Sequence, residues 1–277
     1  MNKKPDTCKI ANAFHQKAVD YDQHVLVQKR VVANLARSIE LNQSQAPASI
    51  LDVGTGTGAL LERMHVLYPN ARLTGVDLAL NMCLRTKQKL GSICQAVNGN
   101  AECLPFKAGT FDLVVSASAL QWVGNLSAAI HEMRRVVKSG GDISLAFFCH
   151  GTLGELQHCF RDAVSRGGLG GSQRTSRLHG FWTIDDVKVI LNEMDFERFV
   201  VSVETEVDWY DDLNSLLRSI KNIGAGAASG GTGSGLGWRG VLQETSRLYQ
   251  EKHGKAGKIP ATYNVLYLSA QTRLQPS

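Results

Sequence analysis

The sequence predicts an α/β fold in which helices cover both faces of a mostly parallel sheet. Short apolar runs alternate with helix-compatible segments between residues 49 and 148, and this alternation is typical of parallel strands joined by helical crossovers. The apolar run at residues 50–53 leads at once into glycines 54, 56 and 58, and a second run ends in Asp77. This spacing of glycines and acid is typical of a βαβ unit that binds a nucleotide.

The composition excludes several classes of protein. The chain has 277 residues, 43% of them hydrophobic, which is enough for one full α/β domain with an insertion. No apolar run reaches about 18 residues, so no membrane span is expected, and the first residues lack the apolar core of a secretion signal. The net charge of +5 comes without a dense Lys/Arg tract, so no nucleic-acid partner is expected. Six cysteines without a C-x-x-C pair favour free thiols in a cytoplasmic protein and no metal site.

The first predicted element is a helix near the N-terminus. Residues 14–39 contain no glycine or proline, and Phe14, Ala18, Tyr21 and Val25 recur at helical spacing. Such a stripe predicts one buried helix face. A polar linker follows and leads to the first strand.

The core that follows predicts alternating strands and helices. Strands are expected near residues 49–53, 72–76, 93–97, 111–115 and 142–148. Helices are expected near residues 58–67, 80–90 and 125–138. The last of these helices is predicted to end at Lys138, because Gly140 and Gly141 follow a basic last turn.

The second half of the chain predicts further helices around strands. Thr183 precedes two acids and is a candidate helix N-cap. Residues 224–240 hold eight glycines in seventeen positions, which predicts a mobile surface loop or, alternatively, a lid or docking loop. The other expected elements are helices at 153–164 and 211–223, a loose loop at 166–180, a strand at 199–207 and a last, antiparallel strand at 263–271. The predicted division is an N-terminal helical cap at 1–45, a nucleotide-binding core at 46–150 and a remainder at 151–277.

Asp52 determines which nucleotide we expect at the glycine turn. Gly54, Gly56 and Ala59 also fit the G-x-G-x-x-G/A fingerprint of dinucleotide enzymes. A carboxylate two residues before the first glycine would repel the pyrophosphate of a dinucleotide. S-adenosyl-L-methionine has no phosphate and carries a sulfonium and an ammonium group. The D-x-G-x-G-x-G pattern therefore resembles motif I of class I methyltransferases, and this resemblance implies a Rossmann-like, seven-stranded sheet with a helical cap or insertion.

The predicted cofactor pocket follows from the rule that such sheets bind ligands at the carboxyl ends of their strands. Asp77 is expected to accept hydrogen bonds from the ribose, and Leu78 and Met82 are expected to contact adenine. Most relatives carry Asp where Asn100 stands, but the Asn oxygen can still accept from the adenine amino group. The predicted cofactor-binding residues are Asp52, Gly54, Thr55, Gly56, Gly58, Asp77, Leu78, Met82, Asn100, Ala101, Glu102 and Ser116.

The loop at residues 116–122 is expected where the methyl donor meets its acceptor, with Gln121 and Trp122 as catalytic candidates. Trp122 fits either a cation–π contact with a sulfonium or simple packing in the loop. The loop contains no His or Lys that could act as a base. A carboxylate acceptor, with an ordinary pKa of about 4, would need no base near pH 7.

The whole chain resembles the malonyl-acyl-carrier-protein O-methyltransferases of biotin synthesis. Four groups of segments outside the shared cofactor motifs carry this resemblance. They are Phe14-x-x-x-Ala18-x-x-Tyr21-Asp22-x-His24 with Val27-Gln28, then Leu120-Gln121-Trp122-x-x-Asn125-Leu126, then Gly151-Thr152-Leu153-x-Glu155-Leu156, and finally Ser219-Ile220-Lys221-x-Ile223-Gly224-Ala225 with Ala261-Thr262-Tyr263. Together they span nearly the full length of the chain.

The resemblance implies methyl transfer to the free carboxylate of a malonyl thioester, carried by acyl-carrier protein or by coenzyme A. It implies that Tyr21 lies over the pocket as a hydroxyl donor, although Tyr21 also fits packing in its helix. Arg161 and Lys221 are the candidates for a cation that holds the substrate carboxylate. The cations expected to meet an acidic carrier protein are Arg166, Arg174 and Arg177.

Two other functions remain open from the sequence. One is a methyltransferase that acts on a quinone or another small molecule. The other is a relative without methyl transfer, which assembles a complex or hydroxylates an arginine of a partner protein. The sequence predicts no oligomeric state.

Overall fold

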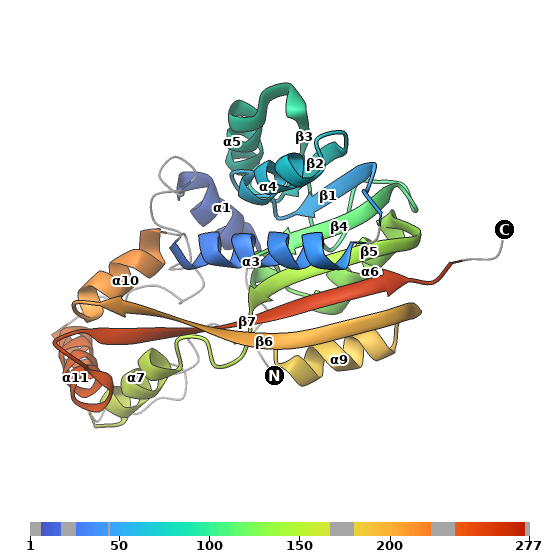
Figure 1. Cartoon of the computed structure of the whole chain (residues 1–277). Coiled ribbons are helices and arrows are strands. Elements are labelled where there is room, and N and C mark those ends of the chain that lie inside the picture. Colours follow the sequence, from blue (N-terminus) through green and yellow to red (C-terminus); the bar gives the residue numbers. More distant parts are fainter. Residues whose placement is uncertain (1–6, 18–25, 44, 167–179, 223–235, 275–277) are drawn as a thin grey trace.

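The computed structural model of the protein describes residues 7–17, 26–43, 45–166, 180–222 and 236–274. A seven-stranded sheet runs through the molecule in the order β3-β2-β1-β4-β5-β7-β6 (Figure 1). Strands β1 to β5 are parallel, and β7 is antiparallel to both of its neighbours. The strands are β1 (Ser49–Val53), β2 (Arg72–Asp77), β3 (Cys94–Asn98), β4 (Phe111–Ala117), β5 (Val137–Phe148), β6 (Phe196–Tyr210) and β7 (Ile259–Thr272). The predicted α/β fold and its antiparallel last strand are confirmed.

Helices cover both faces of the sheet because alternate strand residues bury their side chains on opposite sides. Ile50 of β1 packs into one core cluster, with residues of α3 (Leu26–Asn42) and α4 (Ala59–Leu67). Leu51 and Val53 pack into a second cluster, with residues of α6 (Leu126–Val136) and α9 (Ile184–Asn192). All five residues of β1 are buried. The strand that leads to the glycine turn is thus held between two packed layers.

The helix boundaries of the core follow local signals in the sequence. Helix α4 and helix α5 (Leu80–Leu90) lie at the predicted positions. Helix α9 begins with a capping box, in which the Thr183 hydroxyl accepts from the Asp186 N–H and the Asp186 carboxylate accepts from the Thr183 N–H. This arrangement satisfies two donors that a helix start leaves free. The predicted N-cap at Thr183 is confirmed.

Strands β6 and β7 extend beyond β5 and form the base of a cap at one end of the sheet (Figure 1). Strand β5 pairs with residues 265–271 of β7, whereas β6 pairs with residues 259–272. Among the described residues, the helices at this end are α7 (Gly154–Arg166), α10 (Leu213–Asn222) and α11 (Leu236–His253). Helix α7 packs closely against α11. The cap is therefore part of the same sheet architecture as the core.

Helix α11 was not predicted, and its first residues overlap the glycine-rich run expected to be a loop. From Leu236 onwards the loop prediction is wrong, while residues 223–235 lie outside the described part of the chain. Val241, Leu248 and Tyr249 of α11 are buried in the core shared with α7. Burial of an apolar helix face outweighs the unfavourable helix propensity of a few glycines.

Strand β5 begins earlier than predicted. Val137 already pairs with Phe111 of β4, and a shift in register follows before the regular ladder resumes. The segment expected to end helix α6 therefore continues into the strand. Gly140 adopts a positive φ of 74° there, and a Cβ on Gly141 would lie 2.7 Å from the Asp112 carbonyl oxygen. These two glycines allow the irregular start of the strand.

The expected helix at residues 14–39 is described as the end of α1 (Thr7–Lys17) and most of α3, and residues 18–25 between them lie outside the described part. The division of the chain at residues 45 and 150 stays a prediction. No helix among the described residues has the length and apolar character needed to cross a membrane.

Candidate active site

A cavity of about 440 Å³ lies at the carboxyl ends of β1, β2 and β4. The loops that follow these strands form its walls, together with the loop after β3 and side chains of α1 and α3. This is the edge at which open parallel sheets bind their ligands. The predicted pocket and the observed cavity therefore lie at the same edge of the sheet.

The glycine turn after β1 forms the floor of the cavity. Gly54, Gly56 and Gly58 all have positive φ values, of 75°, 55° and 83°, a conformation that side chains oppose. The N–H groups of Gly54 and Thr55 both donate to the Val76 carbonyl, at 2.7 and 3.0 Å. A Cβ on Gly54 would lie only 2.2 Å from the Cβ of Ala119. The glycine at position 54 thus lets the loop after β4 approach the turn.

Asp77 lies at the end of β2 and lines the cavity. One carboxylate oxygen accepts from the Gly56 N–H at 2.9 Å, and the other accepts from the Ala79 N–H at 2.8 Å. Burial raises the pKa of Asp77, and these two backbone hydrogen bonds oppose the rise. The same side chain therefore fixes the glycine turn and presents its remaining lone pairs at the cavity wall.

Asp52 is a buried carboxylate that makes no hydrogen bond of good geometry among the described residues, although the Thr55 hydroxyl interacts with it. It is 1% exposed and lines the cavity. Burial raises its pKa to about 7, the charge of Asp77 adds to the rise, and the Thr55 hydroxyl opposes it. An unpaired buried carboxylate is costly, so this side chain has an unmet demand for a cation or a donor.

The loop after β3 forms the wall beside Asp77. The Asn100 side-chain oxygen accepts from the Glu102 N–H at 3.0 Å, so one of its two lone pairs is used within the loop. The Glu102 carboxylate accepts from the N–H groups of Gly124 and Asn125 at 2.7 and 3.1 Å. Glu102 thereby joins the loop after β3 to the loop after β4.

Two aromatic rings meet at the side of the cavity formed by α1. Phe14 and Trp122 make an edge contact, with ring centroids 6.0 Å apart, and both line the cavity. The Asn81 amide of α5 donates to the His15 carbonyl at 3.0 Å and ties the end of α1 to α5. Helix α1 and the loop after β4 thus close the cavity together.

Most of the predicted cofactor residues line this cavity, and so does the catalytic candidate Trp122. The predicted residues found in its wall are Asp52, Gly54, Thr55, Gly56, Asp77, Leu78, Met82, Asn100, Ala101, Glu102 and Trp122. The structure brings them together from four loops that are far apart in the sequence. Their roles in binding stay a prediction.

Three predicted residues lie behind the wall and not in it. The Ser116 hydroxyl donates to the Val53 carbonyl at 2.6 Å, and the Gln121 amide donates to the Ser118 carbonyl at 2.7 Å. Gly58 faces Leu90 and Thr86, whose side chains would contact an added Cβ. The hydrogen bonds of Ser116 and Gln121 and the close packing at Gly58 support the shape of the site from outside.

The predicted substrate residues are not gathered at the cavity. Arg161 lies on an exposed face of α7 and donates to the Gln157 carbonyl of its own helix. Lys221 is exposed on α10. Neither lines the cavity, so a carboxylate clamp formed by them has no support in the described structure. Tyr21 lies outside the described residues.

The reasoning from the sequence missed the contribution of α3 and α4. Gln28, Lys29 and Val32 of α3 and Arg63 of α4 also line the cavity. Lys29 and Arg63 are exposed cations that form no ion pair within the described parts of the chain. Gln28 belonged to a segment that carried the family resemblance, but no local pattern distinguishes Lys29 or Arg63 from ordinary surface charges.

The side chains that line the cavity fit S-adenosylmethionine and not a dinucleotide. Asp52 presents an unpaired carboxylate to the cavity, which suits a sulfonium or an ammonium group and opposes a pyrophosphate. Asp77 suits the ribose hydroxyls, and the apolar side chains of Leu78 and Met82 suit an aromatic base. The lining also includes the exposed cations Lys29 and Arg63, so it offers partners to both the cationic and the anionic groups of such a ligand.

Comparison with known proteins agrees with this interpretation. Residues 51–145 match the family described as Methyltransferase domain. Among solved structures, the YcgJ protein from Bacillus subtilis is similar, with a TM-score of 0.61 and 15% identity over 88% of this chain and 99% of that one. A putative methyltransferase from Bacillus halodurans is also similar, with a TM-score of 0.59 and 17% identity over 87% of this chain and 99% of that one. At these identities the likeness shows the fold alone. Fold and domain together define a class I S-adenosylmethionine-dependent methyltransferase.

The curated relatives narrow the class to a family. The malonyl-[acyl-carrier protein] O-methyltransferase of Geobacter sulfurreducens is 42% identical over 95% of this chain and 97% of the relative. The protein of the same name from Laribacter hongkongensis is 30% identical over 95% of this chain and 88% of the relative. A biotin biosynthesis bifunctional protein of Teredinibacter turnerae is 28% identical over 97% of this chain and 47% of the relative. The chain belongs to the malonyl-[acyl-carrier protein] O-methyltransferase family.

Proposed function

We propose that this protein methylates the free carboxylate of a malonyl thioester and that the ester serves biotin synthesis. The observation that carries the proposal is the 42% identity over 95% of the chain to a malonyl-[acyl-carrier protein] O-methyltransferase. The domain match alone covers residues 51–145, which hold the donor pocket. The full-length likeness also includes β6, β7 and the cap helices, which lie outside the match to the methyltransferase domain.

The proposed donor site uses the residues that line the cavity. S-adenosylmethionine would supply an electrophilic methyl group on its sulfonium. Asp52 would balance its positive charge, and Asp77 would accept from the ribose hydroxyls. Lys29 and Arg63 would attract the carboxylate of its methionine part. The remaining proposed contacts, to the base and along the turn, are Gly54, Thr55, Gly56, Leu78, Met82, Asn100, Ala101 and Glu102.

The chemistry of the cavity suits an acceptor that needs no base. Its described lining contains no histidine, the side chain that most often acts as a general base. Two of its carboxylates, Asp77 and Glu102, accept from backbone N–H groups, and Asp52 is the proposed partner of the sulfonium. A carboxylate is already ionised at that pH, so the protein has only to orient it and to exclude water. The apolar rings of Phe14 and Trp122 are suited to the second task.

A methyl-transfer assay tests the proposal directly. Purified protein is incubated with labelled S-adenosylmethionine and with malonyl-acyl-carrier protein, malonyl-coenzyme A or, as a control without a free carboxylate, the acetyl thioesters. We expect label in the malonyl samples alone, released as methanol by mild base because the product is an ester. The assay also gives the preference between the two carriers.

The proposal fails if the protein binds S-adenosylmethionine well and yet labels no malonyl thioester. Label on a phenol or a quinol instead would favour a small-molecule methyltransferase. Stable copurification with a partner subunit, without methyl transfer to any acceptor, would favour a role in assembly.

A further inference from the structure

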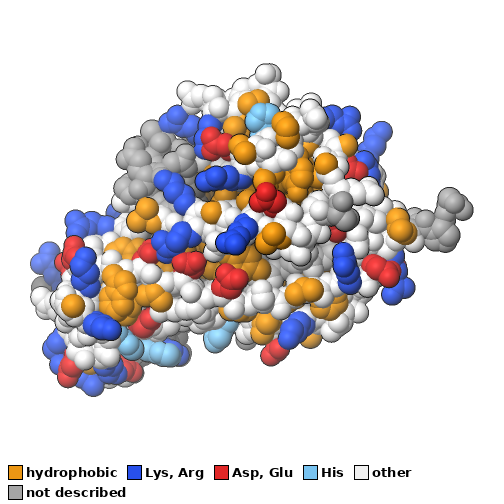
Figure 2. Space-filling model, viewed as in Figure 1, with side chains coloured by type: hydrophobic (Ala, Val, Ile, Leu, Met, Phe, Trp, Pro, Cys, Tyr) orange, Lys and Arg blue, Asp and Glu red, His pale blue; other side chains and the backbone are white. Residues whose placement is uncertain are grey.

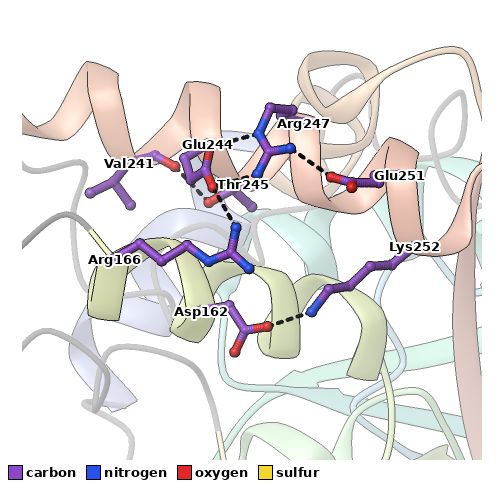
Figure 3. A network of polar contacts seen from close by, with 8 residues as sticks. All are labelled: Asp162, Arg166, Val241, Glu244, Thr245, Arg247, Glu251 and Lys252. Carbon is purple, nitrogen blue, oxygen red and sulfur yellow. Dashed lines mark hydrogen bonds and ion pairs between the residues drawn. The ribbon is translucent and has the colours of Figure 1, made fainter.

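The acidic side chains of the cap helices are all engaged within the cap. Asp162 of α7 pairs with Lys252 of α11 at 2.6 Å. Glu244 pairs with both Arg166 and Arg247, and Arg247 also pairs with Glu251 (Figure 3). The Glu155 carboxylate accepts from the Thr262 hydroxyl. These helices therefore offer no free carboxylate to an approaching molecule.

Several cations of the same helices remain unpaired. Helix α10 contains no acid, and its Arg218 and Lys221 are exposed. They lie three residues apart and so project from one side of the helix. Leu216 and Ile220 are buried on the opposite side. No ion pair involves Arg218 or Lys221 within the described chain. Arg218 donates to the Asn214 carbonyl of its own helix. The hydrogen bond from the Ser215 N–H lowers the pKa of Asp212, the exposed acid just before α10, and the charge of Arg218 adds to this shift. Helix α10 thus has a basic outer face.

Helix α10 lies at the end of the molecule where α3 begins (Figure 1). The Tyr210 hydroxyl at the end of β6 is 3.2 Å from the Ser219 hydroxyl of α10. Glu206 and Asp208, earlier on β6, bind Arg30 of α3 at 2.7 and 2.6 Å. Helix α10 and the start of α3 are therefore attached to the same stretch of β6. The residue before Arg30, Lys29, lines the cavity.

We propose that the outer face of α10, formed by Arg218 and Lys221, docks the acidic carrier protein that presents the malonyl thioester. This inference rests on the proposed function and names where its protein partner binds. Unpaired exposed cations add little to stability, but they accelerate the encounter with a partner of opposite charge and orient it. The carrier then sits beside the start of α3, and its flexible arm has a short route to the cavity.

The structure favours α10 over the loop that the sequence suggested for this contact. Arg166 already binds Glu244 at 3.2 Å (Figure 3), so its charge is compensated. Arg174 and Arg177 lie outside the described residues. In Figure 2, many Lys and Arg side chains, with Asp and Glu side chains between them, lie at the end of the molecule where α10 and α11 lie in Figure 1.

The test compares charge-reversed variants on three substrates that share one reacting group. Arg218→Glu and Lys221→Glu are assayed with malonyl-acyl-carrier protein, with malonyl-coenzyme A and with S-malonyl-pantetheine, which carries neither protein nor phosphate. Lys188→Glu is the matched control, since Lys188 is an exposed cation on α9. We expect KM for the carrier-protein substrate to rise roughly five- to tenfold in each α10 variant. For malonyl-pantetheine, KM and kcat should match those of the native protein.

Salt gives a second readout. Raising NaCl should increase KM of the native protein for the carrier-protein substrate, because salt screens attraction between exposed charges. In the α10 variants, KM for this substrate should rise less with salt.

An equal rise of KM on all three substrates would overturn the proposal and restore Lys221 as a carboxylate clamp. An equal rise of KM for the carrier-protein substrate in Lys188→Glu would also overturn it, and so would an unchanged KM in both α10 variants. If the native protein labels no malonyl thioester at all, the proposed function has failed and not this docking site alone.

Discussion

Two regions of the molecule are stabilised by different kinds of contact: the cavity with its glycine turn, called here the donor end, and the cap formed by α7, α10 and α11, called the cap end. At the donor end, turn geometry and buried hydrogen bonds determine the shape of the cavity, as in the contacts of Asp77 with Gly56 and Ala79. At the cap end, exposed ion pairs such as Asp162–Lys252 join helices that are distant in sequence. A buried contact tolerates little change, whereas an exposed pair contributes little to stability. We therefore expect substitutions at the donor end to cause the largest losses of stability and of cofactor affinity.

The largest expected effect is that of Gly54→Ala. The new Cβ would lie 2.2 Å from the Cβ of Ala119, at a backbone φ of 75°. Strain and overpacking together should lower the free energy of unfolding by roughly 2–5 kcal/mol, and binding of S-adenosylmethionine should fall below detection. Urea denaturation and titration calorimetry measure the two effects.

Gly56→Ala is the matched control for this substitution. Its φ is also positive, at 55°, but an added Cβ meets nothing within 4 Å. Only backbone strain remains, at about 1–2 kcal/mol. Equal losses in the two variants would show that the approach of Ala119 does not matter.

The next effect in size is that of Asp77→Ala. This change removes an acceptor from the proposed ribose site and from two backbone N–H groups. Affinity for S-adenosylmethionine should fall by roughly 1.5–3 kcal/mol. Calorimetry on Asp77→Asn, which keeps one oxygen acceptor, should give an intermediate loss. Unchanged affinity in Asp77→Ala would remove this residue from the cofactor site.

Asp52 should make the stability of the donor end depend on pH. Burial raises its pKa to about 7 in the folded protein, against about 4 when unfolded. The folded state then binds more protons than the unfolded state between these values, so the stability of the ligand-free protein should fall as pH rises from about 4 to 7. Asp52→Asn should flatten this slope in denaturation experiments at several pH values.

A cationic ligand should reverse the effect of pH at the same side chain. Because it stabilises the ionised carboxylate, S-adenosylmethionine should bind more tightly as pH rises through about 7, with release of a proton. Calorimetry in two buffers with different ionisation enthalpies measures that proton. No proton release in the native protein would contradict the proposed contact with Asp52.

The smallest expected effect lies in the cap. The hydrogen bond from Arg247 lowers the pKa of Glu244 to about 2, with a smaller contribution from Arg166, and partial burial opposes this shift. Its ionised form stabilises the fold above the ordinary range of a glutamate, and this contribution disappears as pH falls towards 2. Glu244→Gln should lower the melting temperature only slightly at pH 7 and leave cofactor affinity unchanged. A clear loss of cofactor affinity would show that the two ends of the molecule are coupled.

The same contrast explains what the sequence could and could not predict. The glycine turn and Asp77 follow local rules, in which a buried strand, a tight turn and an acid at the next strand end form one unit. Helix α11 follows no such rule, because its apolar face is stabilised by α7, about 80 residues earlier in the chain. Phe14 was expected on a helix stripe, but its contact with Trp122 depends on how α1 packs on the sheet.

Charged residues that bind substrate or cofactor are the hardest to predict. Arg161 and Lys221 were chosen from their position in the insertion, and charge type alone does not tell a clamp from a solvent-exposed side chain. Lys29 and Arg63 were missed for the same reason, since only the folded chain shows that they border the cavity.

Asp77 places a constraint on any attempt to redesign the nucleoside preference of this enzyme. Its carboxylate holds the backbone of Gly56 in place while facing the cavity. Replacing it to accommodate a different sugar would also release the turn from its hydrogen bond, so the loss would affect substrates that never touch position 77. A successful redesign would need a new acceptor for the Gly56 N–H before Asp77, the proposed partner of the ribose, could be changed.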